Sequence, residues 1–204
     1  MDRPAAVAIL AAVPILALVF YAFTRLLPPF WGYGAALAFY WICVLLPLIL
    51  WRGGFARARF AVTRPSTVLT LLNIGPIIVV ACVAAYALSQ NILPAYVLIA
   101  VALAALTNGT LEEVFWRGTL LLDDATANEQ IGQIVLFSGW HIALLFAGGV
   151  VVTGGGLALL AGAAFFGILW TLARMQTGAI GFGILCHVAL NVFAFTELAT
   201  QNVV

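Results

Sequence analysis

The chain has 204 residues, of which 65% are hydrophobic and only 7% are charged, and its formal net charge is +1. A soluble domain carries about 25% charged residues, so this composition excludes a water-soluble globular protein. All eight basic residues are arginines, and they are scattered rather than gathered on one stretch, which excludes a nucleic-acid-binding surface. The composition is that of an integral membrane protein.

Seven apolar segments follow one another along the chain. A helix needs about 20 apolar residues to cross a hydrocarbon core, and runs this long lack the alternation of a membrane β-strand. The sequence therefore predicts an all-α, polytopic bundle of about seven transmembrane helices in a single membrane domain, residues 1–204. Three spans lie within 1–90, and a catalytic core covers 94–199. The expected segments are 5–27, 31–51, 68–89, 94–122, 131–147, 157–174 and 179–199.

The loop between the second and third segments predicts the orientation of the chain. It contains Arg52, Arg57, Arg59 and Arg64, which are half of all the basic residues. Cytoplasmic loops carry an excess of Arg and Lys, so this loop and the amino terminus are predicted to be cytoplasmic, although Arg25 then lies outside. A short chain rich in Ala and Arg and free of Lys is typical of a prokaryotic protein, which predicts a prokaryotic plasma membrane.

Polar residues occur inside three of these apolar segments. A charge at the centre of a bilayer costs at least about 2.5–3.5 kcal/mol, so such residues are rare and usually face the bundle interior. Glu112, His141 and His187 each lie eight to ten residues from the predicted cytoplasmic end of their helices. At about 1.5 Å per residue this depth is roughly 12–15 Å, near the midplane. The sequence therefore predicts that three helices bring polar groups to one level.

The spacing within each helix suggests separate roles. Glu113 and Arg117 are four residues apart and are predicted to form an ion pair. Glu112 is left without that partner, which makes it the candidate general base. His187 and Asn191 are also four apart and share one helix face, so both can hydrogen-bond the same point.

These motifs resemble those of the CAAX protease and bacteriocin-processing family, which includes the type II CAAX prenyl endopeptidases. The family pattern is Glu-Glu-x-x-x-Arg, then Phe-x-x-x-His, then His-x-x-x-Asn, each in a membrane helix. This chain has the three motifs in that order at residues 112–117, 137–141 and 187–191. The resemblance covers about residues 94–195, and the first three spans match only as hydrophobic helices.

The resemblance implies a metal-independent glutamate protease. Glu112 would activate water, and His141 would help to orient that water and pass protons. His187 and Asn191 would hydrogen-bond the developing oxyanion.

The resemblance assigns structural support to Glu113, Arg117 and Phe137, of which Phe137 lies one turn before His141 and can shield that imidazole. It implies no metal and no cofactor. The implied partners are membrane lipid and a peptide or protein substrate, with or without an attached lipid, and no nucleic acid.

Several alternatives stay open. A zinc peptidase could use Glu and His ligands, but the chain lacks His-Glu-x-x-His and Asn is a poor zinc ligand. A cysteine protease would need a thiolate facing His, and Cys186 adjoins His187 without sharing its helix face. A proton-relaying transporter would often show an internal repeat, and none is present. A non-catalytic scaffold or bacteriocin-immunity protein of the same family would tolerate Glu112→Gln, whereas a protease would not.

Overall fold

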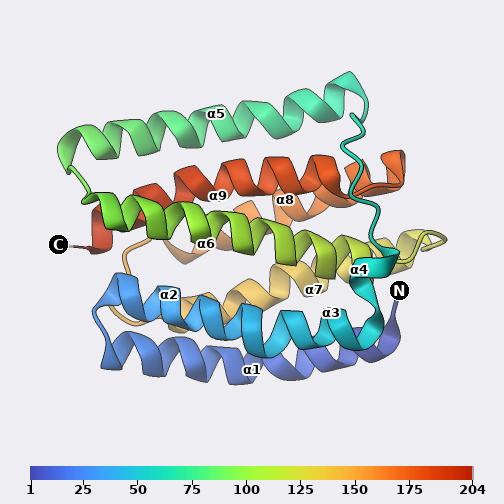
Figure 1. The fold of residues 1–204 in the computed structure, drawn as a ribbon, viewed down its shortest axis with the longest axis horizontal. Helices are drawn as coiled ribbons and strands as arrows, with labels where there is room; N and C mark the ends of the chain where they lie inside the picture. Colours follow the sequence, from blue (N-terminus) through green and yellow to red (C-terminus); the bar gives the residue numbers. More distant parts are fainter. Residues whose placement is uncertain (204) are drawn as a thin grey trace.

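The computed structural model describes residues 1–203, and all of the regular structure in that range is helical (Figure 1). Two of the elements, η1 and η2, are π-helical continuations of α-helices, and η3 is a 3₁₀-helix. In chain order the elements are α1 (Arg3–Leu26), α2 (Pro29–Phe39), η1 (Tyr40–Leu45), α3 (Leu46–Arg52), α4 (Gly54–Arg57), α5 (Thr67–Gln90), α6 (Ala95–Glu113), η2 (Val114–Thr119), α7 (Ala127–Trp140), η3 (His141–Phe146), α8 (Gly155–Thr177) and α9 (Gly181–Asn202).

Six continuous helices are long and apolar enough to cross a membrane. Large apolar side chains such as Leu10, Leu18 and Leu103 are exposed on their outer faces, where lipid would cover them. Together these features make the protein an integral membrane protein. The six helices are Arg3–Leu26, Pro29–Arg52, Thr67–Gln90, Ala95–Thr119, Gly155–Thr177 and Gly181–Asn202.

The remaining predicted span, 131–147, consists of α7 followed by η3. A Cβ on Gly132 in α7 would lie 3.7 Å from the Met1 side chain, beside the start of α1. After η3, a Cβ on Gly148 would lie 3.5 Å from Arg25 Nε, near the end of α1. The composite helix therefore runs the full length of α1, and the two termini lie at opposite ends of the bundle (Figure 1). The prediction of about seven spans is confirmed.

Ion pairs join several connections at one end of the bundle. Asp2, before α1, contacts Arg52 at the end of α3 at 3.0 Å. Asp123, after η2, contacts Arg59 at 3.6 Å and also pairs with Arg174 in the last turn of α8. These connections lie at the same end of the bundle, as expected for helices that cross the membrane in alternating directions. Which compartment that side faces stays a prediction.

The site is built where α6 and α9 pack along each other (Figure 1). A Cβ on Gly109 would lie only 2.8 Å from the backbone nitrogen of Val188, so glycine is required at this crossing. Small residues allow membrane helices to approach closely, because no side chain separates the two backbones. Gly109 therefore brings the end of α6 against the part of α9 that carries the last motif.

Candidate active site

The buried ion pair at the end of α6 is present as the sequence predicted. Arg117 Nη1 donates to Glu113 Oε1 at 2.9 Å, and both side chains are essentially unexposed. Arg117 Nη2 also donates to the backbone carbonyl of Gly167 in α8 at 3.2 Å. The pair thus links η2 to α8 and neutralises one of the two adjacent glutamates.

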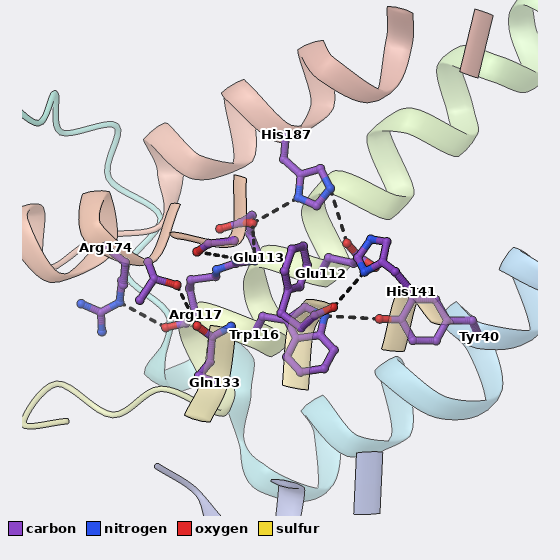
Figure 2. Close-up of polar contacts among 12 residues, drawn as sticks. Tyr40, Glu112, Glu113, Trp116, Arg117, Gln133, His141, Arg174 and His187 are labelled. Atoms are coloured by element: carbon purple, nitrogen blue, oxygen red, sulfur yellow. Dashed lines mark hydrogen bonds and ion pairs between the residues drawn. The ribbon is translucent and has the colours of Figure 1, made fainter. Parts of the chain in front are cut away.

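His187 lies between the two glutamates (Figure 2). Its Nδ1 is 3.1 Å from Glu113 Oε1, and its Nε2 is 3.4 Å from Glu112 Oε2. The imidazole stacks on the Trp170 ring with centroids 4.0 Å apart and an interplanar angle of 22°. Two contacts and one stacking partner therefore fix the plane of this imidazole.

Glu112 is fully buried, and neither of its carboxylate oxygens has a hydrogen-bond partner within residues 1–203. Nε2 of His187 approaches Glu112 Oε2 to 3.4 Å. A buried polar group normally has a partner, and an exception calls for an explanation. With two free acceptor oxygens beside a histidine, the Glu112 carboxylate can accept a hydrogen bond or a proton from a further donor.

The contact at His141 determines which ring nitrogen carries hydrogen. Nδ1 lies 2.8 Å from the backbone carbonyl of Phe137, and because a carbonyl only accepts, Nδ1 must be the donor. In the neutral imidazole Nε2 is then an acceptor. The ring packs against Phe137 and Trp140, with centroids 5.0 and 4.6 Å away. His141 therefore offers one fixed acceptor nitrogen.

A cavity of about 370 Å³ joins the second and third motifs. His141, His187 and Asn191 all line it. Glu112 does not line it, but its carboxylate lies 3.4 Å from Nε2 of His187. Nδ2 of Asn191 is buried and has no partner in the described part of the chain. The cavity therefore holds an unused amide donor close to the two histidines, as the spacing of His187 and Asn191 predicted.

Aromatic rings support the charged groups. The Arg117 guanidinium lies over the Phe137 ring at 4.2 Å from its centroid. A Cβ on Gly167 would meet the same ring at 2.8 Å, so α8 must have glycine there. Phe137 thus packs on both Arg117 and His141, and its supporting role stays a prediction.

Three neighbours of the site escaped the sequence analysis. Trp170 stacks on His187, and Tyr40 accepts a hydrogen bond from Trp116 Nε1 at 3.3 Å. Asn108 lines the cavity, one helical turn before Glu112. Tyr40 lies in an apolar segment with no charged residue nearby in sequence, and Trp170, one turn before Arg174, belongs to none of the three motifs, so no spacing signal marked them. Asn108 could have been found, because it lies four residues before Glu112.

The comparison with protein families agrees with this site. Residues 94–193, about half of the chain, match the family described as Type II CAAX prenyl endopeptidase Rce1-like, and the match contains all three motifs. The protein therefore belongs to the CAAX protease family, and its fold is that of a CAAX-type intramembrane protease. No curated protein and no solved structure matches the chain significantly.

Proposed function

We propose that the protein is an intramembrane endopeptidase in which Glu112 activates water for attack on a peptide bond. The observation that carries this proposal is the pair of unpartnered Glu112 oxygens, fully buried and next to His187. The neighbouring carboxylate, Glu113, is already paired with Arg117. Of the two adjacent glutamates, only Glu112 is free to take a proton from water.

The contacts of His187 define where one proton is held. The Glu113 carboxylate accepts from Arg117 and so is the acceptor toward His187 Nδ1, which must donate. His187 Nε2 and Glu112 Oε2 then share a single proton across 3.4 Å. With that proton on His187, Glu112 is an anion that can act as base and Nε2 is a donor.

The reaction follows from these groups. Water lies between Glu112 and the Nε2 acceptor of His141, and its proton passes to Glu112 as its oxygen bonds to the scissile carbonyl carbon. The carbonyl oxygen becomes an oxyanion that accepts from His187 Nε2 and from Asn191 Nδ2. Glu112 then gives the proton to the leaving amine as the C–N bond breaks. Each oxyanion donor is worth about 10²–10³ in rate.

A second cavity offers a place for a substrate's lipid. It measures about 540 Å³, and its lining from α2, α6 and α9 is almost entirely apolar. It shares Tyr33, Leu37, Phe195 and Leu198 with the site cavity. A peptide bond at the site could therefore belong to a chain whose lipid lies in this second cavity.

The test is cleavage of membrane-tethered fluorogenic peptides, with and without lipid, by the purified protein in detergent. We expect cleavage by the wild type, loss of cleavage in Glu112→Gln, and unchanged cleavage in Glu129→Gln, which alters a half-buried carboxylate that caps α7 and pairs with the N-terminal ammonium group. A chelator should leave cleavage unchanged.

Other outcomes favour the alternatives. Cleavage that a chelator abolishes would indicate a zinc peptidase, although no three His, Cys, Asp or Glu side chains among the described residues are arranged to hold a metal ion. Cleavage that survives Glu112→Gln would reject Glu112 as the base. A wild type that cleaves no peptide would favour a scaffold or immunity protein.

A further inference from the structure

A tryptophan from the second span fixes the orientation of an asparagine beside the site. Trp41 Nε1 donates to Asn108 Oδ1 at 2.8 Å, and both side chains are buried. The oxygen and the NH₂ group of a carboxamide lie in one plane and point in different directions from the carbonyl carbon. Because the oxygen is held toward Trp41, the Nδ2 donors of Asn108 must point away from it.

The position of Asn108 determines what those donors face. Asn108 and Glu112 are four residues apart on α6, so they share one face of that helix. Asn108 lines the same cavity as His141 and Asn191. Asn108 therefore lies at the cavity, on the face of α6 that carries the proposed base.

We propose that Asn108 is a further positioning residue of the active site: during the reaction its amide N–H groups donate to the Glu112 carboxylate, which accepts no hydrogen bond from the described chain at rest, and Trp41 holds the amide in that orientation. This role rests on the proposed function, because it acts through Glu112. An ionised carboxylate only accepts, so an asparagine that is free to turn would sometimes present its own oxygen to Glu112. The indole N–H of Trp41 prevents that orientation.

The proposal also gives the N-terminal spans a part in the site. Trp41 lies outside residues 94–193, the part that matches the family. It belongs to η1, a π-helical turn, and such turns are frequent at functional sites. The preceding residue, Tyr40, accepts from Trp116 of η2 and stacks on Trp140 at 4.0 Å. One turn of the second span thus contacts α6, η2 and α7.

The kinetic test is a double-mutant cycle with Trp41→Phe and Asn108→Leu. A hydrogen bond to a charged group should be worth about 10- to 100-fold, so we expect each variant to lower kcat by that factor with little change in KM. Because Trp41 acts only through Asn108, the double variant should be no slower than Asn108→Leu. Asn73→Leu, which alters a buried asparagine of α5 outside both cavities, should keep full activity.

Two kinetic results would overturn the proposal. If the two losses multiply in the double variant, Trp41 acts through packing and not through Asn108. If KM rises while kcat stays constant, Asn108 contributes to substrate binding and not to the base.

A measurement without substrate separates this proposal from the proposed function. The side-chain NH₂ signals of Asn108 in the ¹H–¹⁵N spectrum of the labelled protein should shift in Glu112→Gln and in Trp41→Phe, while those of Asn73 stay in place. If these signals shift but the protein cleaves no peptide, the result would support the arrangement of Trp41, Asn108 and Glu112 and reject the peptidase function. Unmoved Asn108 signals in an active enzyme would reject the positioning role alone.

Discussion

Nδ1 of His187 lies 3.1 Å from Oε1 of Glu113, the same oxygen that accepts from Arg117 at 2.9 Å. The ion pair on α6 and η2 therefore also orients the histidine on α9. The two adjacent glutamates thus differ in their contacts: Glu113 contacts Arg117 and His187, whereas neither oxygen of Glu112 has a hydrogen-bond partner in the described chain. This difference predicts that the same substitution lowers stability at Glu113 and activity at Glu112.

Glu113→Gln should lower stability, whereas Glu112→Gln should lower only activity. Removing the Glu113 charge leaves the Arg117 guanidinium buried without its partner, and breaking a buried pair costs about 3–5 kcal/mol. Thermal unfolding in detergent should therefore show a clear drop in Tm for Glu113→Gln and a wild-type Tm for Glu112→Gln. Equal Tm values for the two variants would contradict the division of roles.

Asn191→Leu should lower kcat by about 10²–10³ with little effect on KM, because Nδ2 is proposed to donate only to the oxyanion. The substituted side chain has a similar size, and no hydrogen bond of Nδ2 is lost, since Nδ2 has no partner within the described chain. Steady-state kinetics on the cleaved peptide measures both constants. A rise in KM at constant kcat would instead assign Asn191 to substrate binding.

Part of this site follows from sequence alone. The spacing of Glu113 and Arg117 predicted their ion pair, and the depth argument predicted that Glu112 and His187 meet. The assignment of catalytic roles to these residues and the division of the chain into 1–90 and 94–199 stay predictions. Spacing could not reveal the bridging position of His187, because it depends on how closely α9 approaches α6.

The fold shows the same limit. Hydropathy located all of the spans, but the fifth ended up as α7 plus a 3₁₀ turn that starts at His141. The fourth span continues past Glu113 as a π-helix, which hydropathy cannot distinguish from an α-helix. Trp41 and Asn108 meet 67 residues apart in sequence, and a contact between two spans leaves no periodic pattern in either.

Acid should weaken the charged end of the bundle through Asp123. The hydrogen bond from Arg174, together with its charge, holds the pKa of the Asp123 carboxyl below its usual value of 3.8. A lowered pKa in the folded state means that this contribution is full above pH 3.8 and is lost as the pH falls through the folded value. Asp123→Asn should therefore unfold at a lower temperature than wild type at pH 6, and the gap should close below pH 3.8.

Asp124→Asn is the matched control for this pH series, because Asp124 is adjacent and makes no ion pair with any described residue. It should follow the wild type at every pH. A gap between wild type and Asp123→Asn that stays constant down to pH 2 would show that the pair contributes nothing through ionisation.

Gly34→Leu should impair cleavage of lipid-modified peptides while sparing peptides without lipid. Gly34 lines the apolar cavity, and a Cβ there would meet no atom within 4 Å, so the leucine can extend into the space. KM for the lipidated peptide should rise in this variant. Gly75→Leu, which also enters open space but at an exposed position of α5, is the control. Equal effects on both peptides would remove the cavity from the proposal.

Gly109→Ala should separate the two helices that carry Glu112 and His187. The new Cβ would lie 2.8 Å from the backbone nitrogen of Val188, an atom that no rotamer change can move. Overpacking of this kind costs about 1–3 kcal/mol, and the resulting shift lengthens the contact between Glu112 and His187. We expect a lower Tm and a lower kcat together, measured by thermal unfolding and peptide cleavage.

Two controls make this prediction specific to the helix crossing. Gly75→Ala adds a methyl group in open space, so its Tm and kcat should be those of the wild type. Adding Val188→Ala to Gly109→Ala should restore neither, because the backbone nitrogen and Cα of residue 188 stay in place. Full recovery in that double variant would mean that only the valine side chain opposes Gly109, and that the two backbones lie farther apart than the structure has them.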